Sequence, residues 1–235
     1  MSNYDVVVPI HNEGPEVLRH LEGLANSISD EARIILVLDS KQDPTIPHLK
    51  KFISRSQNAE ILINNLGPGP ANAIRCGIAH GGSSKVVVAM ADGCDDYRQI
   101  PELIHLIDRG VEIACASRYC AGGQQIGGPR LKRMLSRLAG KSFRLLTGVA
   151  TSDATNSFKA YNREFINDVH IESSKGFEIG MELIAKAARR NAFVAEIPTT
   201  WIERDFGLSN FKIFSWIPSY LKWYLYGLGI WKRGS

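Results

Sequence analysis

The segment YDVVVPIHNEGPEVLRHLEGLANSISDEARIILVLD, residues 4–39, decides the fold. Its two ends, 4–10 and 33–39, are short runs that are apolar on both faces, as strands of a parallel sheet are when helices cover both sides. Between them, apolar residues recur at helical spacing over 17–28, and Pro15 suits the first turn of a helix. A strand, a helix and a second strand in this order predict a βαβ unit with two parallel strands.

This alternation continues along the first half of the chain. The next apolar runs, which predict further strands, are AEILIN (59–64), KVVVAMA (85–91) and VEIACAS (111–117). Later segments predict a helix, an isolated strand, a second helix and a last strand at 129–147, 153–162, 178–191 and 192–201. We therefore predict an α/β fold with a Rossmann-like, mostly parallel central sheet and helices on both faces. Residues 1–210 are expected to form one domain, and 211–235 an amphipathic, aromatic helical tail.

Composition narrows the class of protein. The chain has 235 residues, of which 44% are hydrophobic and 22% charged, and its net charge is +4. These values exclude a disordered chain. The chain also lacks the concentrated positive charge of a nucleic-acid-binding protein, so we expect no nucleic acid partner. The four cysteines form no C-x-x-C pair and the N-terminus has no signal-peptide pattern, so we expect a cytoplasmic protein. No apolar run reaches the roughly 18 residues that predict a membrane-spanning helix.

Polar or acidic groups follow each expected strand at its carboxyl end. They are His11-Asn12-Glu13, Asp39, the loop 65–71, Asp92-Gly93-Cys94-Asp95-Asp96 and Ser117-Arg118-Tyr119. Ligands of open α/β sheets bind at this edge, so five such groups together favour a nucleotide-like ligand. The glycines at 67 and 69 suit close approach of the backbone to a base or ribose, or simply a tight turn before a helix. They match neither the P-loop nor the dinucleotide fingerprint.

Seven short motifs, in order along the chain, resemble one enzyme family. They are VPIHNE (8–13), LDSKQDPT (38–45), NLGPGPANA (65–73), ADGCDD (91–96), SRY (117–119), DATNSFK (153–159) and ERDFGLS (203–209). Together they are similar to family 2 glycosyltransferases of the GT-A fold. Within that family they resemble the branch of dolichol-phosphate mannose synthase and the polyprenyl-phosphate glycosyltransferases. Each motif alone is weak, whereas the ordered set covers nearly the whole chain.

The resemblance implies a donor site and a metal site. The donor would be a nucleoside diphosphate sugar, bound by Pro9, Glu13, Asp39, Gly67, Gly69, Ala71, Asp92 and Arg118. Asp92 matches the second acid of the family's D-x-D element, which holds Mg²⁺ or Mn²⁺ against the diphosphate. Met90 stands in place of the first acid and is a poor ligand for such ions. Asp95 or Asp96 could compensate; weak metal binding or metal independence is the alternative.

The reaction implied is inverting glycosyl transfer with loss of the nucleoside diphosphate. The catalytic residues implied by the resemblance are Asp153, Asp92, Arg118 and Arg204. The metal and the two arginines would neutralise the departing diphosphate. Asp153 is the candidate general base for a hydroxyl acceptor. A phosphate acceptor is already largely ionised at neutral pH, and Asp153 would then only orient the acceptor or the metal.

A basic segment at 129–146 concerns the acceptor. It contains no acid, and five of its residues share one helical stripe beside a stripe of leucines: Arg130, Arg133, Arg137, Lys141 and Arg144. This pattern suits an anionic phosphate or a membrane surface, and the solvated face of a core helix is the ordinary alternative. We expect the acceptor phosphate to be bound by Lys132, Arg133, Arg137, Arg204 and Ser209.

The tail at 211–233 is rich in Trp and Tyr and contains no acid, which is typical of a helix lying on a membrane surface. Pro218 and Lys222 argue against a spanning helix; packing on the core or homodimerisation through the tail are the alternatives. We predict an enzyme that transfers a hexose from a UDP- or GDP-sugar to a polyprenyl phosphate, peripherally attached to the inner face of the membrane. A soluble or saccharide acceptor, a nucleotidyltransferase and a non-catalytic nucleotide-sugar binding module are the alternatives.

Overall fold

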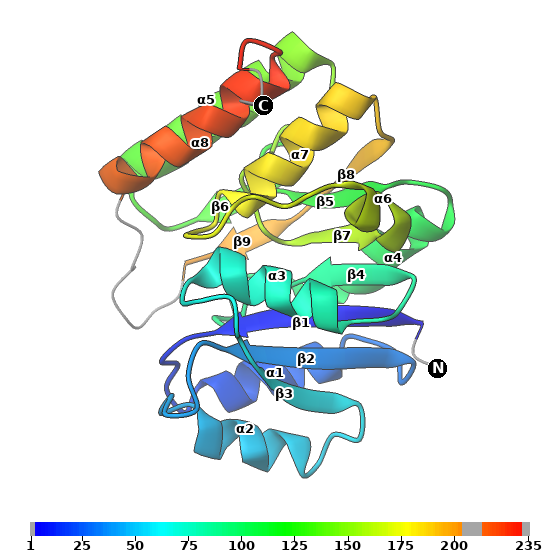
Figure 1. Cartoon of the computed structure of the whole chain (residues 1–235), viewed down its shortest axis with the longest axis vertical. Helices are drawn as coiled ribbons and strands as arrows, with labels where there is room; N and C mark the ends of the chain where they lie inside the picture. The colour runs from blue at the N-terminus through cyan, green and yellow to red at the C-terminus, as the bar shows by residue number, and fades with distance from the viewer. Residues whose placement is uncertain (1–2, 204–212, 232–235) are drawn as a thin grey trace.

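The computed structural model describes residues 3–203 and 213–231. A seven-stranded sheet runs through its centre in the order β3-β2-β1-β4-β7-β5-β8 (Figure 1). The strands are β1 (Tyr4–Ile10), β2 (Ala32–Leu38), β3 (Ala59–Ile63), β4 (Lys85–Val88), β5 (Ile113–Ser117), β7 (Lys159–Asn162) and β8 (Val194–Pro198). The strands from β3 to β4 pair in parallel, as do β5 and β8, whereas β7 lies antiparallel between β4 and β5. The predicted Rossmann-like, mostly parallel sheet is confirmed.

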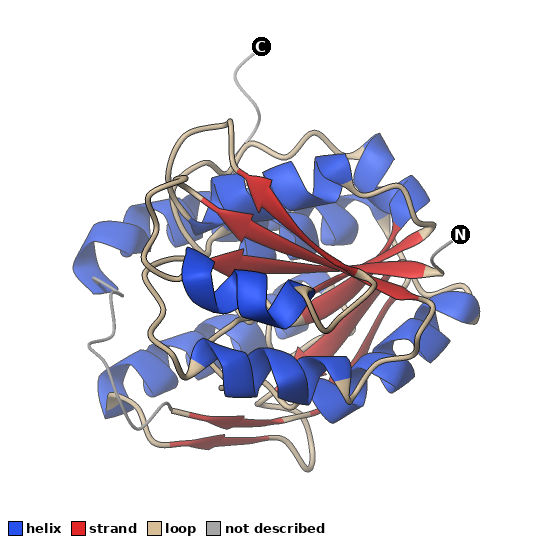
Figure 2. Ribbon diagram, turned by 90° about the horizontal axis from the view of Figure 1, so that it is seen from below, coloured by secondary structure: helices blue, strands red, loops and turns tan. Residues whose placement is uncertain are grey.

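Helices cover both faces of the sheet (Figure 2). The helices on one face are α1 (Val17–Ala25), α2 (Ile46–Ile53) and α4 (Ile100–Asp108), which follows the short η1 (Tyr97–Gln99). Those on the other are α3 (Pro70–His80), α5 (Arg130–Thr147), α6 (Arg163–Asp168), α7 (Ile179–Arg190) and α8 (Ile213–Gly227). Successive side chains of β1 point to opposite faces: Val6 and Val8 pack with α1 and α2, and Val7 packs with α3 and α7. Two apolar cores, one on each face, therefore hold the sheet between the helices. The loops that follow the strands lie at its carboxyl edge.

The two strands expected last in the chain differ from the observed ones, and one short strand was not expected. The strand expected at 153–162 is shortened to β7, because residues 153–158 form a loop of buried polar groups. The strand expected at 192–201 divides into β8 and β9 (Thr200–Ile202). β9 pairs in parallel with β6 (Gln124–Ile126), and this two-stranded sheet stands apart from the large one (Figure 2). β6 lacks an apolar run, so periodicity does not predict it.

The helix of the C-terminal tail packs on the rest of the chain. α8 contacts α7 and α5 and runs beside α5 at one end of the molecule (Figure 1). Trp223 is buried in the second core, and the rings of Tyr224 and Phe143 lie 5.3 Å apart. Among the residues with described positions, no helix combines the length and apolar character needed to cross a membrane.

Candidate active site

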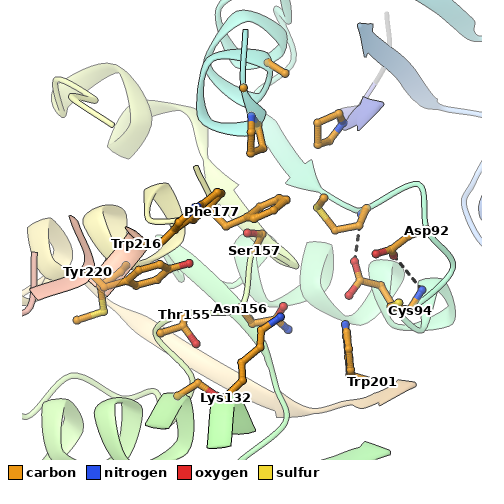
Figure 3. A pocket seen from close by; sticks show the side chains of 18 of the residues that line it. Asp92, Cys94, Lys132, Thr155, Asn156, Ser157, Phe177, Trp201, Trp216 and Tyr220 are labelled. Atoms are coloured by element: carbon orange, nitrogen blue, oxygen red, sulfur yellow. Dashed lines mark hydrogen bonds between the residues drawn. The ribbon is translucent and has the colours of Figure 1, made fainter. Parts of the chain in front are cut away.

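A cavity of about 750 Å³ opens at the carboxyl edge of the large sheet. One part is lined by residues that follow β1, β2, β4 and β5 and the glycine loop before α3: Glu13, Asp39, Gly69, Asp92, Asp95 and Arg118. The other part lies between α5 and α8 and is lined by Leu135, Ala139, Ile217, Tyr220, Leu221 and Tyr224. Figure 3 shows Asp92 on one side, Trp216 and Tyr220 on the other, and Lys132 between them. The cavity thus joins a charged part to an apolar part.

Two carboxylates are suited to hold a divalent cation. Asp92 is half-buried, Asp95 is buried, and both line the cavity. Burial and the neighbouring charge of Asp92 raise the pKa of Asp95 to about 7, so a bound cation would relieve this repulsion. Asp96 does not line the cavity and instead accepts hydrogen bonds from Arg98 at 2.7 and 2.8 Å. Asp95 rather than Asp96 is therefore the residue placed to compensate for the replaced acid.

The donor set fits Mg²⁺ or Mn²⁺ bound with a diphosphate. Within 3–203 and 213–231, no three His, Cys, Asp or Glu side chains form a metal-binding group. Mg²⁺ is commonly held by one or two carboxylates together with substrate phosphates. Asp92 and Asp95 supply that number of carboxylates, and the phosphates of the donor would supply further oxygen ligands.

Arg118 and Asp153 form a buried ion pair beneath the cavity. Arg118 donates from Nε and Nη2 to the two carboxylate oxygens of Asp153 at 2.7 and 2.8 Å, and its backbone N–H donates at 3.0 Å. Burial opposes ionisation of Asp153, but the charge and hydrogen bonds of Arg118, together with the charge of Lys159, keep the pKa of this carboxyl below its usual value. Asp153 is fully buried, and Arg118 rather than Asp153 lines the cavity. This geometry favours Asp153 as an anchor for Arg118 over Asp153 as a proton acceptor.

Asp39, which follows β2, forms hydrogen bonds with the glycine loop at 65–71 and with the residue before it. Its two carboxylate oxygens accept hydrogen bonds from the Asn64 amide at 2.8 Å and from the Gly69 N–H at 2.9 Å. Gly69 has a φ of +119°, and a Cβ there would come 2.5 Å from the carbonyl oxygen of Lys175, so only glycine fits. Pro9, Glu13, Asp39 and Gly69 line the cavity as expected, whereas Gly67 and Ala71 do not. Ala71 is buried in the second core.

Two further residues, Asp43 and Thr45, hold the loop after β1 by hydrogen bonds. Asp43 accepts a hydrogen bond from the backbone N–H of Asn12 at 3.0 Å, and Thr45 binds both the N–H and the carbonyl of Glu13. Asn12 adopts a φ of 51°, a left-handed conformation that these bonds help to hold. Asp43 and Thr45 belong to the LDSKQDPT motif, so the motif was the signal that could have identified them.

The α5 face that lines the cavity differs from the expected basic stripe. Lys132, Leu135, Ser136 and Ala139 line the cavity, and burial lowers the pKa of Lys132. Arg133 donates to the backbone carbonyl of Gln125 at 3.4 Å, and neither it nor the exposed Arg137 lines the cavity. Arg204 and Ser209 lie outside the described residues.

Ser136 is a cavity residue that the charge pattern of α5 does not predict. Its hydroxyl shares a hydrogen bond with Tyr119, and it stands one helical turn after Lys132. Helical spacing from Lys132 was the signal that could have identified it.

The fold is that of the GT-A glycosyltransferases. Solved structures with this fold include glucosyl-3-phosphoglycerate synthase from Mycobacterium tuberculosis in complex with Mn²⁺, UDP and phosphoglyceric acid. The TM-score is 0.73 at 15% identity, covering 99% of this chain and 81% of that one. The family model of glycosyl transferase family 2 matches residues 5–169. The chain therefore belongs to glycosyl transferase family 2.

Two relatives are similar over most of the sequence. A polyprenol monophosphomannose synthase of Mycolicibacterium smegmatis is 28% identical over 211 residues, which are 87% of this chain and 79% of that protein. An undecaprenyl-phosphate mannosyltransferase of Micrococcus luteus is 24% identical over 209 residues, 87% of this chain and 85% of that protein. The expected family, fold and enzyme class are confirmed. Membership of this family removes the nucleotidyltransferase and the non-catalytic binding module as alternatives.

Proposed function

We propose that this glycosyltransferase moves a hexose from a nucleoside diphosphate sugar to the phosphate group of a polyprenyl phosphate. One observation supports this acceptor above all: the cavity continues from the carboxylates and Arg118 into an apolar part between α5 and α8. A phosphate on a long hydrocarbon chain matches both parts, with its anionic head beside Lys132 and its chain between the helices. The names of the two relatives agree with a polyprenyl phosphate acceptor and make mannose the first sugar to test.

The donor part of the cavity provides the groups that the leaving diphosphate needs. Asp92 and Asp95 would hold a divalent cation together with the donor phosphates, and that cation would neutralise charge on the departing diphosphate. Arg118 offers a positive charge whose position Asp153 fixes. Because the guanidinium is already held in place, little reorganisation is needed as negative charge develops.

The acceptor needs orientation more than deprotonation. A phosphate monoester has a second pKa of about 6, so most of it carries two charges at neutral pH. One phosphate oxygen attacks the anomeric carbon and forms the new sugar–phosphate bond, while the bond from that carbon to the diphosphate oxygen breaks with its electron pair. No proton has to be removed. Lys132 and Ser136 line the cavity from α5 and would orient the phosphate. Because the phosphate is already ionised, Asp153 would not be needed as a general base.

The outer face of α5 supports attachment to a membrane. Apolar side chains are exposed along it, including Leu138 at 63% and Leu145 at 82%. Arg130, Arg137 and Lys141 are exposed on the adjoining stripe of the same helix. A helix with exposed leucines beside basic residues suits the interface of an anionic bilayer. Ile217 and Leu221 of α8 are also exposed and line the cavity, so a lipid acceptor would enter from this surface.

The acceptor is tested by phase partition. The full-length chain is incubated with UDP- and GDP-hexoses labelled in the sugar, with Mg²⁺ or Mn²⁺, and with vesicles that contain or lack polyprenyl phosphate. Label should enter the organic phase with one of the donors, and only when the lipid phosphate is present. Label that stays in water with every donor, although donor is consumed, would overturn the proposed acceptor in favour of a soluble one.

A further inference from the structure

His20 of α1 contacts the loop that carries Asp92 and Asp95. Its Nδ1 lies 3.0 Å from the carbonyl oxygen of Ala91, 71 residues further along the chain. A carbonyl oxygen can only accept, so this hydrogen bond requires the proton to be on Nδ1. His20 does not line the cavity, although the residue that follows Ala91 does.

The His20 ring also lies against the residue after Asp92. Gly93 has a φ of +72°, and a Cβ on it would come 2.6 Å from both Cδ2 and Nε2 of His20. The ring therefore fills the space that a side chain at Gly93 would occupy, while its Nδ1 fixes the carbonyl of Ala91. His20 thus touches both neighbours of Asp92 from outside the loop.

Other hydrogen bonds of this loop fix its two ends and the inside of the turn. Met90 donates its N–H to Asp95 at 3.1 Å and accepts at its carbonyl from the Tyr97 hydroxyl at 2.5 Å, so both fix the start of the loop. At its far side the carbonyl of Cys94 accepts from the backbone N–H of Ile202 at 3.2 Å. Within the turn, Asp92 Oδ1 accepts from the backbone N–H of Cys94 at 3.1 Å, and the Gly93 backbone forms a hydrogen bond with Tyr97. His20 adds the contact from α1, on the side of Gly93 where no side chain stands.

We propose that His20 is a positioning residue that holds the Ala91–Gly93 turn so that Asp92 faces the cavity and can bind the divalent cation. This inference rests on the metal role given to Asp92 under the proposed function. Without the ring, the carbonyl of Ala91 loses this donor and Gly93 loses the side chain packed against it, so the turn is held less firmly when the cation binds. Partners that orient metal ligands typically contribute 10- to 100-fold to metal affinity, so we expect Mn²⁺ to bind about tenfold more weakly without His20.

The test measures Mn²⁺ binding by electron paramagnetic resonance, with the full chain and either UDP or GDP present. In His20→Asn the side-chain amide nitrogen can occupy the place of Nδ1, whereas His20→Leu keeps a similar volume and has no donor. His105, exposed on α4 and outside the cavity lining, gives the matched control His105→Leu. His20→Leu should weaken Mn²⁺ binding about tenfold, with His20→Asn and the control close to the wild type and all melting temperatures similar.

Different results would contradict the role of His20, the metal role of Asp92 and the proposed acceptor. Equal Mn²⁺ binding by His20→Leu and the wild type would overturn the positioning role. The role would also be overturned if His20→Leu and His20→Asn weakened Mn²⁺ binding equally and both lowered the melting temperature. A wild type that binds no Mn²⁺ with either nucleotide would overturn the metal role and this inference, while transfer to lipid could still be observed by phase partition. The absence of lipid-linked product from a wild type whose Mn²⁺ binding follows the prediction would contradict the proposed acceptor alone.

Discussion

Two arginines, Arg118 beside the donor part of the cavity and Arg137 on α5, show how differently the two parts of this molecule are built. The Arg118 side chain is 11% exposed and makes a two-point ion pair with a fully buried carboxylate. Arg137 is exposed on the outer part of α5, close to leucines that are themselves exposed. The donor part is thus preformed by buried contacts between distant segments. The α5 flank is instead an open surface of exposed leucines and basic side chains.

The largest effect should come from the donor part. Asp92→Asn removes a carboxylate expected to hold the cation, and the loss of several kcal/mol of charge stabilisation in the transition state corresponds to about a 1000-fold fall in kcat/KM. Asp96→Asn is the matched control, because Asp96 pairs with the exposed Arg98 and does not line the cavity. Steady-state kinetics with saturating Mn²⁺ measure both. Similar values for the two variants would show that the donor part does not depend on Asp92.

Asp153→Asn tests whether the buried pair has a positioning role. Removing the carboxylate leaves Arg118 buried without its counter-charge, which should lower the free energy of unfolding by about 3 kcal/mol at pH 7. Urea unfolding measures this value. Glu22→Gln, in an exposed pair with Arg55 at 3.6 Å, should cost less than about 1 kcal/mol.

The pH dependence of this difference has a definite sign. The pKa of Asp153 is lowered from 3.8 in the folded chain, so its contribution is complete above about pH 4 and is lost as pH falls through the folded-state pKa. The wild type and Asp153→Asn should therefore converge in stability in acid. An unchanged stability, combined with a rate that no longer rises with pH, would instead support Asp153 as a general base.

On the α5 flank, Leu138→Glu should weaken vesicle binding without destabilising the fold. Burial of one leucine side chain in an apolar environment contributes about 2 kcal/mol, so partition onto anionic vesicles should fall about 30-fold. Leu138→Trp should retain binding, because tryptophan favours membrane interfaces. Co-sedimentation with vesicles measures partition, and analytical ultracentrifugation shows whether the same face joins two copies. Vesicle binding equal to that of the wild type, with a change from dimer to monomer, would assign the face to a homodimer.

The smallest effect should come from single charges on that flank. Arg137→Gln removes one charge near the bilayer, about 1 kcal/mol, so binding to anionic vesicles should weaken about fivefold. Lys51→Gln is the control, since Lys51 is exposed on α2, at the opposite end of the molecule from α5 (Figure 1). At 1 M salt the two should not differ, because charges are screened beyond about 3 Å. A salt-independent effect would mean that Arg137 contributes by packing rather than by charge.

The fold could be predicted where periodicity and strand ends carry the information. Runs such as 4–10 and 33–39 are apolar on both faces, and they form adjacent strands of the sheet. The antiparallel direction of β7 could not be predicted, because its four residues, KAYN, contain no pattern that indicates the direction of a strand. The same holds for β6, which pairs with the distant strand β9.

In the site, the sequence predicts which loops lie at the carboxyl edge of the sheet, but it does not predict the contacts between these loops. The hydrogen bond from the Asn12 N–H to Asp43 joins residues 31 apart in the chain, and the one from His20 to the Ala91 carbonyl joins residues 71 apart. No local sequence pattern indicates either bond. The predicted acceptor residues follow the charge pattern of α5. The rotation of this helix about its axis depends instead on packing. Gly140 and the buried Phe143 face inward, and a Cβ at Gly140 would meet the backbone of Ser152, so the helix turns Lys132 rather than Arg137 toward the cavity.

The central claim is that one cavity serves a polar donor and a lipid phosphate. It is tested most directly by comparing kcat/KM for prenyl phosphates of increasing chain length with kcat/KM for phosphoglyceric acid, using the same labelled donor. If the α5–α8 part of the cavity holds the chain, kcat/KM should rise with chain length and phosphoglyceric acid should not be glycosylated. Values independent of chain length, or faster transfer to phosphoglyceric acid, would contradict the account.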